Sequence, residues 1–216
     1  MGAVAVRIHT PEFRGLQKDR VLTDVDLMSY SKYENAIKSF LVGRGLKPLE
    51  FYYGEGRQIY ENHYHIDVFF NELSMNHVID LRGRLELDYP TITVTDLLLG
   101  KLQIVQINEK DLKDSAILLR EHDISEQEGK ELVDSRHISR RMAKDWGFYY
   151  TFTQNLKRLD SFSATYLPTG DYQVVSGRIK DLLNRIESEP KSTGWKIRAG
   201  VGLRRKWYQD VEEVIR

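Results

Sequence analysis

Two aspartates two residues apart indicate a metal site. Asp24 and Asp26 lie in the otherwise mostly apolar segment RVLTDVDLM, residues 20–28. In a β-strand, side chains at i and i+2 project from the same face of the sheet. Two close carboxylates repel each other unless a proton or a cation separates them, and Mg²⁺ prefers carboxylate oxygens. The pair therefore indicates a magnesium site, although solvated charges at the edge of a sheet would give the same pattern.

A third aspartate can join this pair. Asp67 lies in the β-rich run YHIDVFF, residues 64–70, and it completes a cluster of three carboxylates if the two runs form neighbouring strands. Such a cluster can hold two Mg²⁺ ions beside a nucleoside triphosphate, one activating an attacking hydroxyl and the other stabilising the leaving pyrophosphate. The histidines His63, His65 and His9 are either metal ligands or ordinary hydrogen-bonded side chains.

The elements that would position these residues form an α/β half that extends to about residue 95. In chain order, the sequence predicts a strand or helix over 3–9, a loop over 10–20, a strand over 21–28, an amphipathic helix over 31–45, a strand and a turn within 47–60, a strand over 64–70, and loop and extended chain over 71–94. The amphipathic helix places Tyr33, Ile37, Phe40 and Leu41 on one face.

From about Thr95 the pattern becomes helical. Apolar residues recur at helical spacing in four segments, 95–107, 110–122, 137–159 and 177–190. Ser125 and Glu128 match the S-x-x-E capping box, which predicts a further helix beginning there. Pro190 is expected to end the last helix.

Aromatic and basic residues gather in this helical half. The aromatic residues Trp146, Phe148, Tyr149, Tyr150 and Phe152 are expected to form core between helices rather than to stack on a base. Basic residues recur in the segment SRHISRRMAK and in the tail KSTGWKIRAGVGLRRKWYQ, where two tryptophans lie among them. Such a mixture suits RNA, although runs of this kind are more often a solvated basic face.

The composition is that of an ordinary globular protein. Hydrophobic residues make up 41% and charged residues 30% of the 216 residues, so a sizeable core can form without metals or disulfides. Lys and Arg together number 32, as do Asp and Glu, and the net charge therefore indicates neither a nucleic acid nor a membrane. The absence of cysteine excludes disulfides and thiolate chemistry and fits a cytoplasmic protein. No apolar stretch approaches the roughly 20 residues of a membrane span.

The order of these motifs resembles that of the nucleotidyltransferase superfamily. The matching segments are GAVAVRIH, RVLTDVDLM, HIDVFF and LLLGKLQIVQINEKDLKDSAILL. The family places a pair of small residues before a helix, an arginine before D-x-D, a third aspartate on a later strand, and lysine and Lys-Asp motifs in the helical region. The resemblance covers residues 2–120 and is closest to the minimal nucleotidyltransferases and the AbiEii-type branch of toxin–antitoxin systems.

This resemblance implies a role for each matching residue. Asp24 and Asp26 match the metal-binding pair, and Asp67 matches the third metal carboxylate, which also helps to activate the acceptor hydroxyl. Gly2 and Ala3 stand at the glycine-rich pair, where small residues allow backbone N–H groups to approach the phosphates of the nucleotide.

Further charged residues match the family pattern. Arg20 matches the arginine before D-x-D, which can neutralise phosphate or pair with an aspartate. Lys101 resembles the lysine that follows the sheet and is assigned a catalytic role. Lys110 is assigned to nucleotide binding and, together with Asp111 and Asp114, resembles the charged motif of the helical region. These residues would contact the triphosphate or tie the two halves of the protein together.

The sequence therefore predicts an α+β fold. A small mixed-sheet nucleotidyltransferase core is expected over residues 1–95, and a helical domain with a basic C-terminal tail over 96–216. Because the chain opens on packed small and apolar residues rather than a polar lead-in, we expect this core to lack the family's first helix and strand, either because they are missing or because the start of the sequence is assigned too late.

The expected function is Mg²⁺-dependent transfer of a nucleoside monophosphate from an NTP to a hydroxyl acceptor, with no membrane involved. The alternative is a non-catalytic nucleotidyltransferase-like module that binds a protein or nucleic-acid partner. The acceptor, whether RNA, a protein hydroxyl or a small molecule, stays open at this point.

Overall fold

A mixed β-sheet carries the predicted carboxylates. The computed structural model describes residues 1–17, 21–49, 56–62 and 64–211, and in these residues four strands pair in the order β1-β4-β3-β2. The strands are β1 (Asp24–Ser29), β2 (Lys47–Pro48), β3 (Arg57–Glu61) and β4 (His65–Phe70). β1 and β4 run parallel, whereas β3 is antiparallel to both β4 and β2. The two aspartate-bearing runs are therefore neighbouring strands.

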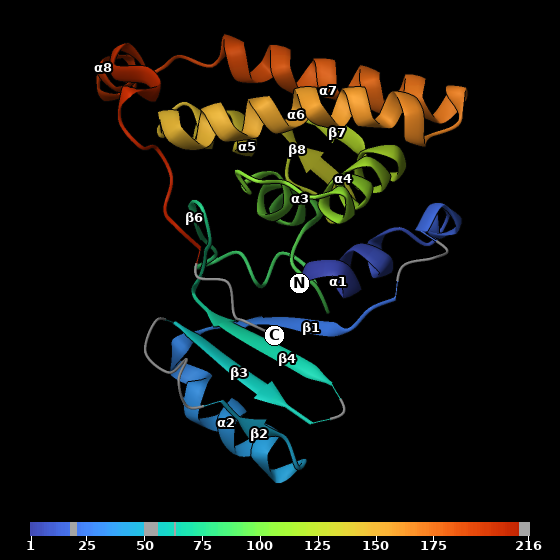
Figure 1. The fold of residues 1–216 in the computed structure, drawn as a ribbon, viewed down its shortest axis with the longest axis vertical. Helices are drawn as coiled ribbons and strands as arrows, with labels where there is room; N and C mark the ends of the chain where they lie inside the picture. Colours follow the sequence, from blue (N-terminus) through green and yellow to red (C-terminus); the bar gives the residue numbers. More distant parts are fainter. Residues whose placement is uncertain (18–20, 50–55, 63, 212–216) are drawn as a thin grey trace.

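Different elements cover the two faces of this sheet. Val68 packs with Leu41 of helix α2 (Glu34–Gly43) on the lower face in Figure 1. Phe69 packs instead into the main core beneath the other helices. Because side chains alternate along a strand, Asp67 shares the face of Phe69 and points toward those helices.

Helix α2 buries less of its apolar face than its sequence pattern predicts. Leu41 is buried, but Tyr33 and Phe40 are 49% and 58% exposed. The helix lies at the outer end of the molecule, where the small sheet is its main neighbour (Figure 1).

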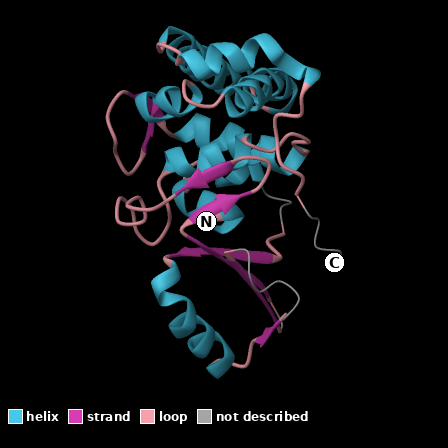
Figure 2. Ribbon diagram, turned by 90° about the vertical axis from the view of Figure 1, so that its left-hand side faces the viewer, coloured by secondary structure: helices cyan, strands magenta, loops and turns pink. Residues whose placement is uncertain are grey.

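The remaining helices stack above the sheet (Figures 1 and 2). They are α1 (Gly2–His9), α3 (Val94–Leu102), α4 (Glu109–Glu121), α5 (Ser135–Met142), α6 (Trp146–Tyr166), α7 (Thr169–Ser188) and α8 (Thr193–Val201). The segment over 3–9, which fitted either a strand or a helix, is thus helical. Helix α1 contacts β1 on one side and α3 and α4 on the other.

Shorter elements connect these layers. They are the single turns η1 (Arg14–Gln17), η2 (Ser31–Tyr33) and η4 (Gly202–Arg204), the antiparallel hairpin of β5 (Glu72–Ser74) and β6 (Val78–Asp80), and the parallel pair β7 (Asp123–Ser125) and β8 (Leu132–Asp134).

The helix predicted to begin at the S-x-x-E motif is wrong. Ser125 is the last residue of β7, and its hydroxyl accepts a hydrogen bond from the backbone N–H of Gln127 at 3.0 Å. The next helix, α5, begins ten residues later and is capped by Asp134, whose carboxylate accepts from the N–H of His137 at 2.9 Å. A serine hydroxyl can close a short turn as readily as it caps a helix.

The main hydrophobic core joins the N-terminal helix to the helical layers. Ala5 and Val6 of α1 lie in the same buried cluster as Phe69 of the sheet and as Phe148 and Phe152 of α6. Phe148 and Phe152 of the aromatic run are thus core, as expected, whereas Tyr149 and Tyr150 are half-buried and Trp146 lines a cavity. The fold is α+β. The boundary at residue 95 stays a prediction, since α1 packs with the later helices α3 and α4. Among the described residues, none of the helices is both long enough and apolar enough to cross a lipid bilayer.

Leu98→Ala should destabilise the protein by about 3 kcal/mol, because it opens a cavity in a site that the surrounding layers cannot collapse. Leu98 is 0% exposed in the main core. The matched control is Leu203→Ala, at a leucine that is 54% exposed, and it should change stability by less than about 0.5 kcal/mol. Urea unfolding measures both, and equal midpoints would contradict the assigned core.

Candidate functional site

The strand register places the three aspartates on one face. In the parallel pair of β1 and β4, the Cα atom of Asp26 lies opposite that of Asp67, and Asp24 lies opposite His65. Partners in register on adjacent strands, about 4.8 Å apart, direct their side chains to the same face. This is the face on which α1 lies (Figure 1).

The first residues of α1 meet Asp26 directly. Gly2 has a φ of +63°, and a Cβ atom added to it would lie 1.7 Å from Oδ2 of Asp26. The N-terminal amino group of Met1 donates to the backbone oxygen of Asp26 at 2.6 Å. Glycine at position 2 therefore permits both the positive φ and the close approach of the Asp26 carboxylate. Ala3 is half-buried in the same helix.

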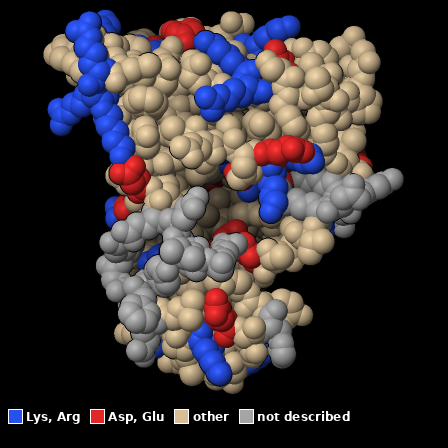
Figure 3. All heavy atoms as spheres, viewed as in Figure 1, with Lys and Arg blue, Asp and Glu red and all other residues tan. Residues whose placement is uncertain are grey.

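Lys101 of α3 faces the same cavity as Asp26. This cavity, of about 180 Å³, is lined by Gly2, Asp26 and Lys101, and by Asp111 of α4. Lys101 Nζ lies 3.0 Å from Oδ1 of Asp111 and 2.8 Å from Oδ2 of Asp114. Burial on its own lowers the pKa of Lys101, but the two carboxylates raise it overall, so the lysine stays charged. Figure 3 shows a hollow edged by acidic side chains between the sheet and the helices.

Apolar side chains form most of the remaining wall. They are Phe69, Leu73, Met75, Ile92, Leu97 and Ile104. The other acidic side chain, Asp96, is already neutralised, because Nε of Arg84 donates to both of its oxygens at 2.8 and 2.9 Å. Lys101 is likewise paired, with Asp111 and Asp114, so Asp26 is the charged group of this cavity that an incoming cation would meet.

The environment of Asp26 disfavours its negative charge. Burial is the largest cause of its raised pKa, and the neighbouring carboxylates of Asp67 and Asp24 raise it further. The amino group of Met1 and the ammonium of Lys101 oppose this shift without cancelling it. A cation at this position would relieve the electrostatic cost.

Asp67 is held by a residue that sequence reasoning missed. It is 3% exposed, and its Oδ2 accepts a hydrogen bond from Nη2 of Arg57 at 2.6 Å. Its Oδ1 has no hydrogen-bond partner among the described residues and lies 3.3 Å from Nε2 of His65. No spacing rule pairs Arg57 with Asp67; the antiparallel register of β3 and β4 brings them together.

The other predicted residues fall elsewhere. Lys110 is exposed in the first turn of α4 and is not among the described residues that line the cavity. Arg20 and His63 lie outside the described residues. His9 lies 3.2 Å from the carboxylate of Glu131.

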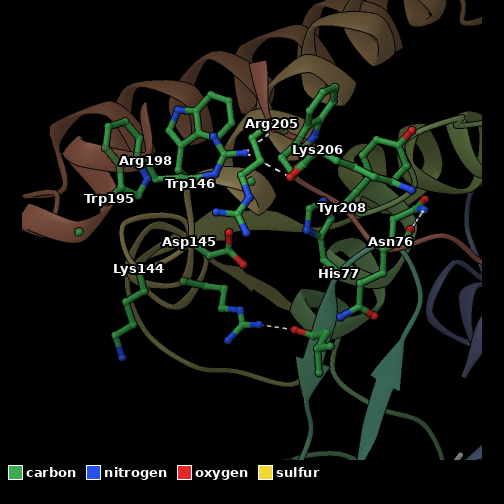
Figure 4. A pocket seen from close by; sticks show the side chains of 16 residues that line it. Asn76, His77, Lys144, Asp145, Trp146, Trp195, Arg198, Arg205, Lys206 and Tyr208 are labelled. Carbon is green, nitrogen blue, oxygen red and sulfur yellow. Dashed lines mark hydrogen bonds between the residues drawn. The ribbon is translucent and has the colours of Figure 1, made fainter. Parts of the chain in front are cut away.

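A second and larger cavity, of about 620 Å³, lies between the β5–β6 hairpin, the start of α6 and the C-terminal segment (Figure 4). Its basic residues are Arg141, Lys144, Arg198, Arg205 and Lys206, and its acidic lining residue among those described is Asp145. Figure 3 shows Lys and Arg side chains gathered over the α8 end of the helical layers. The cavity therefore carries an excess of positive charge.

Some of these cations are engaged within the protein. The guanidinium of Arg198 lies 4.6 Å from the ring centre of Trp146, and Lys206 forms an ion pair within the C-terminal segment. Among the described residues, Lys144 and Arg205 have no ion-pair partner. In Figure 4 Arg205 extends toward Asp145, whereas the side chain of Lys144 extends away from it. His77 adds no charge at neutral pH, because burial lowers its pKa to about 4.

Comparison with protein-family models, curated proteins and solved structures finds no match for this chain. The function therefore has to be inferred from its residues and their geometry.

Asp26→Asn should leave the metal-free protein as stable as the wild type or more stable at pH 7. The folded-state pKa of Asp26 is raised, so its ionised form costs stability above that pKa. This cost fades as the pH falls toward the ordinary aspartate range, where the carboxyl group is protonated in both states. Thermal midpoints are measured without divalent metal from pH 7 to pH 4. The difference in midpoint between Asp26→Asn and the wild type should shrink as the pH falls. The control is Asp80→Asn at an exposed carboxylate, whose midpoint should stay close to that of the wild type at every pH. A midpoint lower than that of the wild type for Asp26→Asn at pH 7 would refute the claim that the charge of Asp26 is unfavourable in the folded protein.

Proposed function

We propose that this chain is a Mg²⁺-dependent nucleotidyltransferase, of the kind that its sequence resembles, which moves a nucleoside monophosphate from an NTP to a hydroxyl acceptor. One observation carries the proposal. Asp26 stands in register with Asp67 beneath the first residue of α1, and Lys101 faces the same cavity. Carboxylates for metal, a backbone approach for phosphate and a buried cation are the parts that this chemistry needs.

The residues present fit a magnesium ion. Asp24, Asp26 and Asp67 would hold it, because they project from one face of the sheet. Oδ1 of Asp67 is buried without a hydrogen-bond partner among the described residues, and burial with carboxylate neighbours raises the pKa of Asp26. A hard cation, which prefers oxygen ligands, would give Oδ1 of Asp67 a partner and stabilise the charged form of Asp26. When bound, Mg²⁺ would make the attacking hydroxyl more acidic and stabilise charge on the departing pyrophosphate.

The residues around this cluster would bind and orient the nucleotide. The N-terminal end of α1 would offer its backbone N–H groups to phosphate, and Gly2 allows this end to lie close to Asp26. Lys101 lies between Asp111 and Asp114, and it would reach the triphosphate by exchanging one of these carboxylates for a phosphate oxygen. The cavity, at about 180 Å³, is smaller than the roughly 300–1,000 Å³ of sites that enclose a whole ligand, so it would take only part of the NTP.

Asp67 would act on the acceptor. Oδ1 has one lone pair for the ion and a second that would accept the proton of the acceptor hydroxyl. The hydroxyl oxygen would form a bond to the α-phosphorus, and the bond from the α-phosphorus to the bridging oxygen would break to release pyrophosphate. Arg57 holds the other oxygen of Asp67 at 2.6 Å and so orients the carboxylate.

Incubation with each α-labelled NTP, Mg²⁺ and cell extract should label an acceptor. Asp26→Asn should lower this transfer by at least about a hundredfold, since the metal contributes several kcal/mol to the transition state and each 1.36 kcal/mol is tenfold. The control Asp80→Asn should transfer at the wild-type rate. Nuclease and protease digestion then identify the acceptor class. Equal labelling by wild type and Asp26→Asn, or no labelling with any NTP, would count against the enzyme.

A second candidate function, binding of a nucleic-acid partner, is favoured by the basic cavity. Five basic side chains line it against one acid. It adjoins the first cavity through the β5–β6 hairpin, since Met75 lines the first cavity and Asn76 and His77 line the second. This function needs neither Mg²⁺ nor NTP and could serve a catalytic or a non-catalytic protein.

Fluorescence anisotropy with a labelled single-stranded RNA tests this second function. The double variant Lys144→Ala, Arg205→Ala should bind more weakly, and its log–log dependence of affinity on salt should be shallower by about 1.4, the value for two lost phosphate contacts. The matched control changes Lys157 and Lys180, two exposed lysines outside the cavity, to alanine. Equal affinity and salt slope in both double variants would exclude the cavity as the binding site.

A further inference from the structure

We infer that His9, His122 and Glu131 form a binding site for a zinc-type transition-metal ion, separate from the carboxylates of the proposed active site. Each residue offers one nitrogen or oxygen atom, and these atoms lie within 4.8 Å of one another. His9 is the last residue of α1, His122 directly follows α4, and Glu131 directly precedes β8. The end of α1 thus meets a part of the chain more than a hundred residues later.

The carboxylate of Glu131 lies between the two imidazole rings. Nδ1 of His9 is 3.2 Å from both of its oxygens, and Nδ1 of His122 is 3.4 Å from Oε2. In a tetrahedral zinc site with bonds of about 2.0–2.2 Å, neighbouring ligand atoms are roughly 3.3–3.6 Å apart. The groups therefore already stand close to the spacing that a shared ion requires.

His122 faces Glu131 through Nδ1. This nitrogen lies 3.2 Å from the backbone carbonyl oxygen of Glu131 and 3.4 Å from Oε2 of its carboxylate. Without an ion, Nδ1 would carry the proton, because a carbonyl only accepts. With an ion between Nδ1 and the carboxylate, the lone pair of Nδ1 would face the metal and the proton would lie on Nε2.

His9 has a comparable arrangement. Its Nε2 lies 3.2 Å from the carbonyl oxygen of Ile92, and a proton there leaves the Nδ1 lone pair facing the Glu131 carboxylate. The opposite tautomer, with Nδ1 donating to Glu131 and the hydroxyl of Thr91 donating to Nε2 at 2.5 Å, would satisfy His9 without an ion. With an ion, Nδ1 of both histidines would face the metal, and the Glu131 carboxylate would ligate it instead of accepting from the rings.

A buried carboxylate behind His9 completes the pattern. Oδ2 of Asp88 lies 3.7 Å from Nε2 of His9 and has no hydrogen-bond partner among the described residues. A carboxylate near the non-ligating nitrogen of a metal-binding histidine orients the ring and makes it a better ligand. Two imidazoles with one carboxylate favour zinc over magnesium.

The exposure of the three ligands suits a metal that enters from solvent. Both histidines are 4% exposed, whereas the side chain of Glu131 is 62% exposed. Solvent can therefore supply the remaining ligand. The bound ion would fasten the C-terminal end of α1, whose first residue, Gly2, meets Asp26 in the proposed active site.

Metal titration of the untagged, chelator-treated full chain tests this site. Excess Mg²⁺ is kept present to occupy oxygen-only sites, and Zn²⁺ binding is measured by calorimetry with the thermal midpoint as a second readout. Co²⁺ serves as a spectroscopic probe, because its visible absorption reports nitrogen ligands in tetrahedral geometry. The variants are Glu131→Gln and His122→Gln, and the matched control is Glu126→Gln, at a carboxylate whose side chain is 58% exposed nearby in the chain.

Wild type and Glu126→Gln should each bind one Zn²⁺ per chain and gain thermal stability from it. Glu131→Gln, which keeps the size of an exposed side chain and so should fold, is expected to weaken binding by at least about a hundredfold, the upper end of what a lost supporting group costs. His122→Gln should abolish the Co²⁺ spectrum. Stoichiometric binding that both variants retain, or no Zn²⁺ binding by the wild type, would overturn the inference.

Discussion

The parallel pairing of β1 with β4 is the constraint on which the candidate site depends. It sets Asp26 beside Asp67 and turns both toward α1. A shift of one residue in either strand would send one aspartate to the opposite face, against α2. The apolar neighbours on the two faces hold the register, because Val68 and Phe69 pack into different cores.

The charges near these aspartates are arranged to leave one ligand position open. Arg57 holds one oxygen of Asp67, while Lys101 is held by Asp111 and Asp114. Each contact fixes a charged group without neutralising the cluster as a whole. The pKa of the Asp26 carboxyl is raised, first by burial and then by the carboxylates of Asp67 and Asp24. An unfavourable electrostatic energy of this kind is common in binding sites, where charged groups are positioned for a ligand rather than for the stability of the fold.

Helix α1 links the two metal sites that we propose. Gly2 at one end lies against Asp26, and His9 at the other end lies against Glu131. Between them, Ala5 and Val6 are buried in the main core. Anything that fixes the C-terminal end of this helix would also fix the backbone that approaches Asp26, so a structural ion at His9 would support the proposed active site without entering its chemistry.

Local sequence determined the elements of this protein well. The apolar residues that flank Asp24 and Asp26 predict β1, the run around Asp67 predicts β4, and helical periodicity predicts most of the helices after Thr95. These patterns are readable because burial of one face imposes a period of two on strands and about 3.6 on helices. The helix start predicted at Ser125 is wrong for a local reason too, because the S-x-x-E motif fits a short turn as well as a helix cap.

Tertiary structure alone decided which residues meet. It placed Arg57 on Asp67, left Lys110 outside the first cavity, and brought His122 and Glu131 to His9. A periodic pattern specifies the face from which a side chain projects, but not the element that covers that face. Partners more than a hundred residues apart in the chain are chosen by how whole layers pack, because packing sums over many weak contacts that no short stretch of sequence contains.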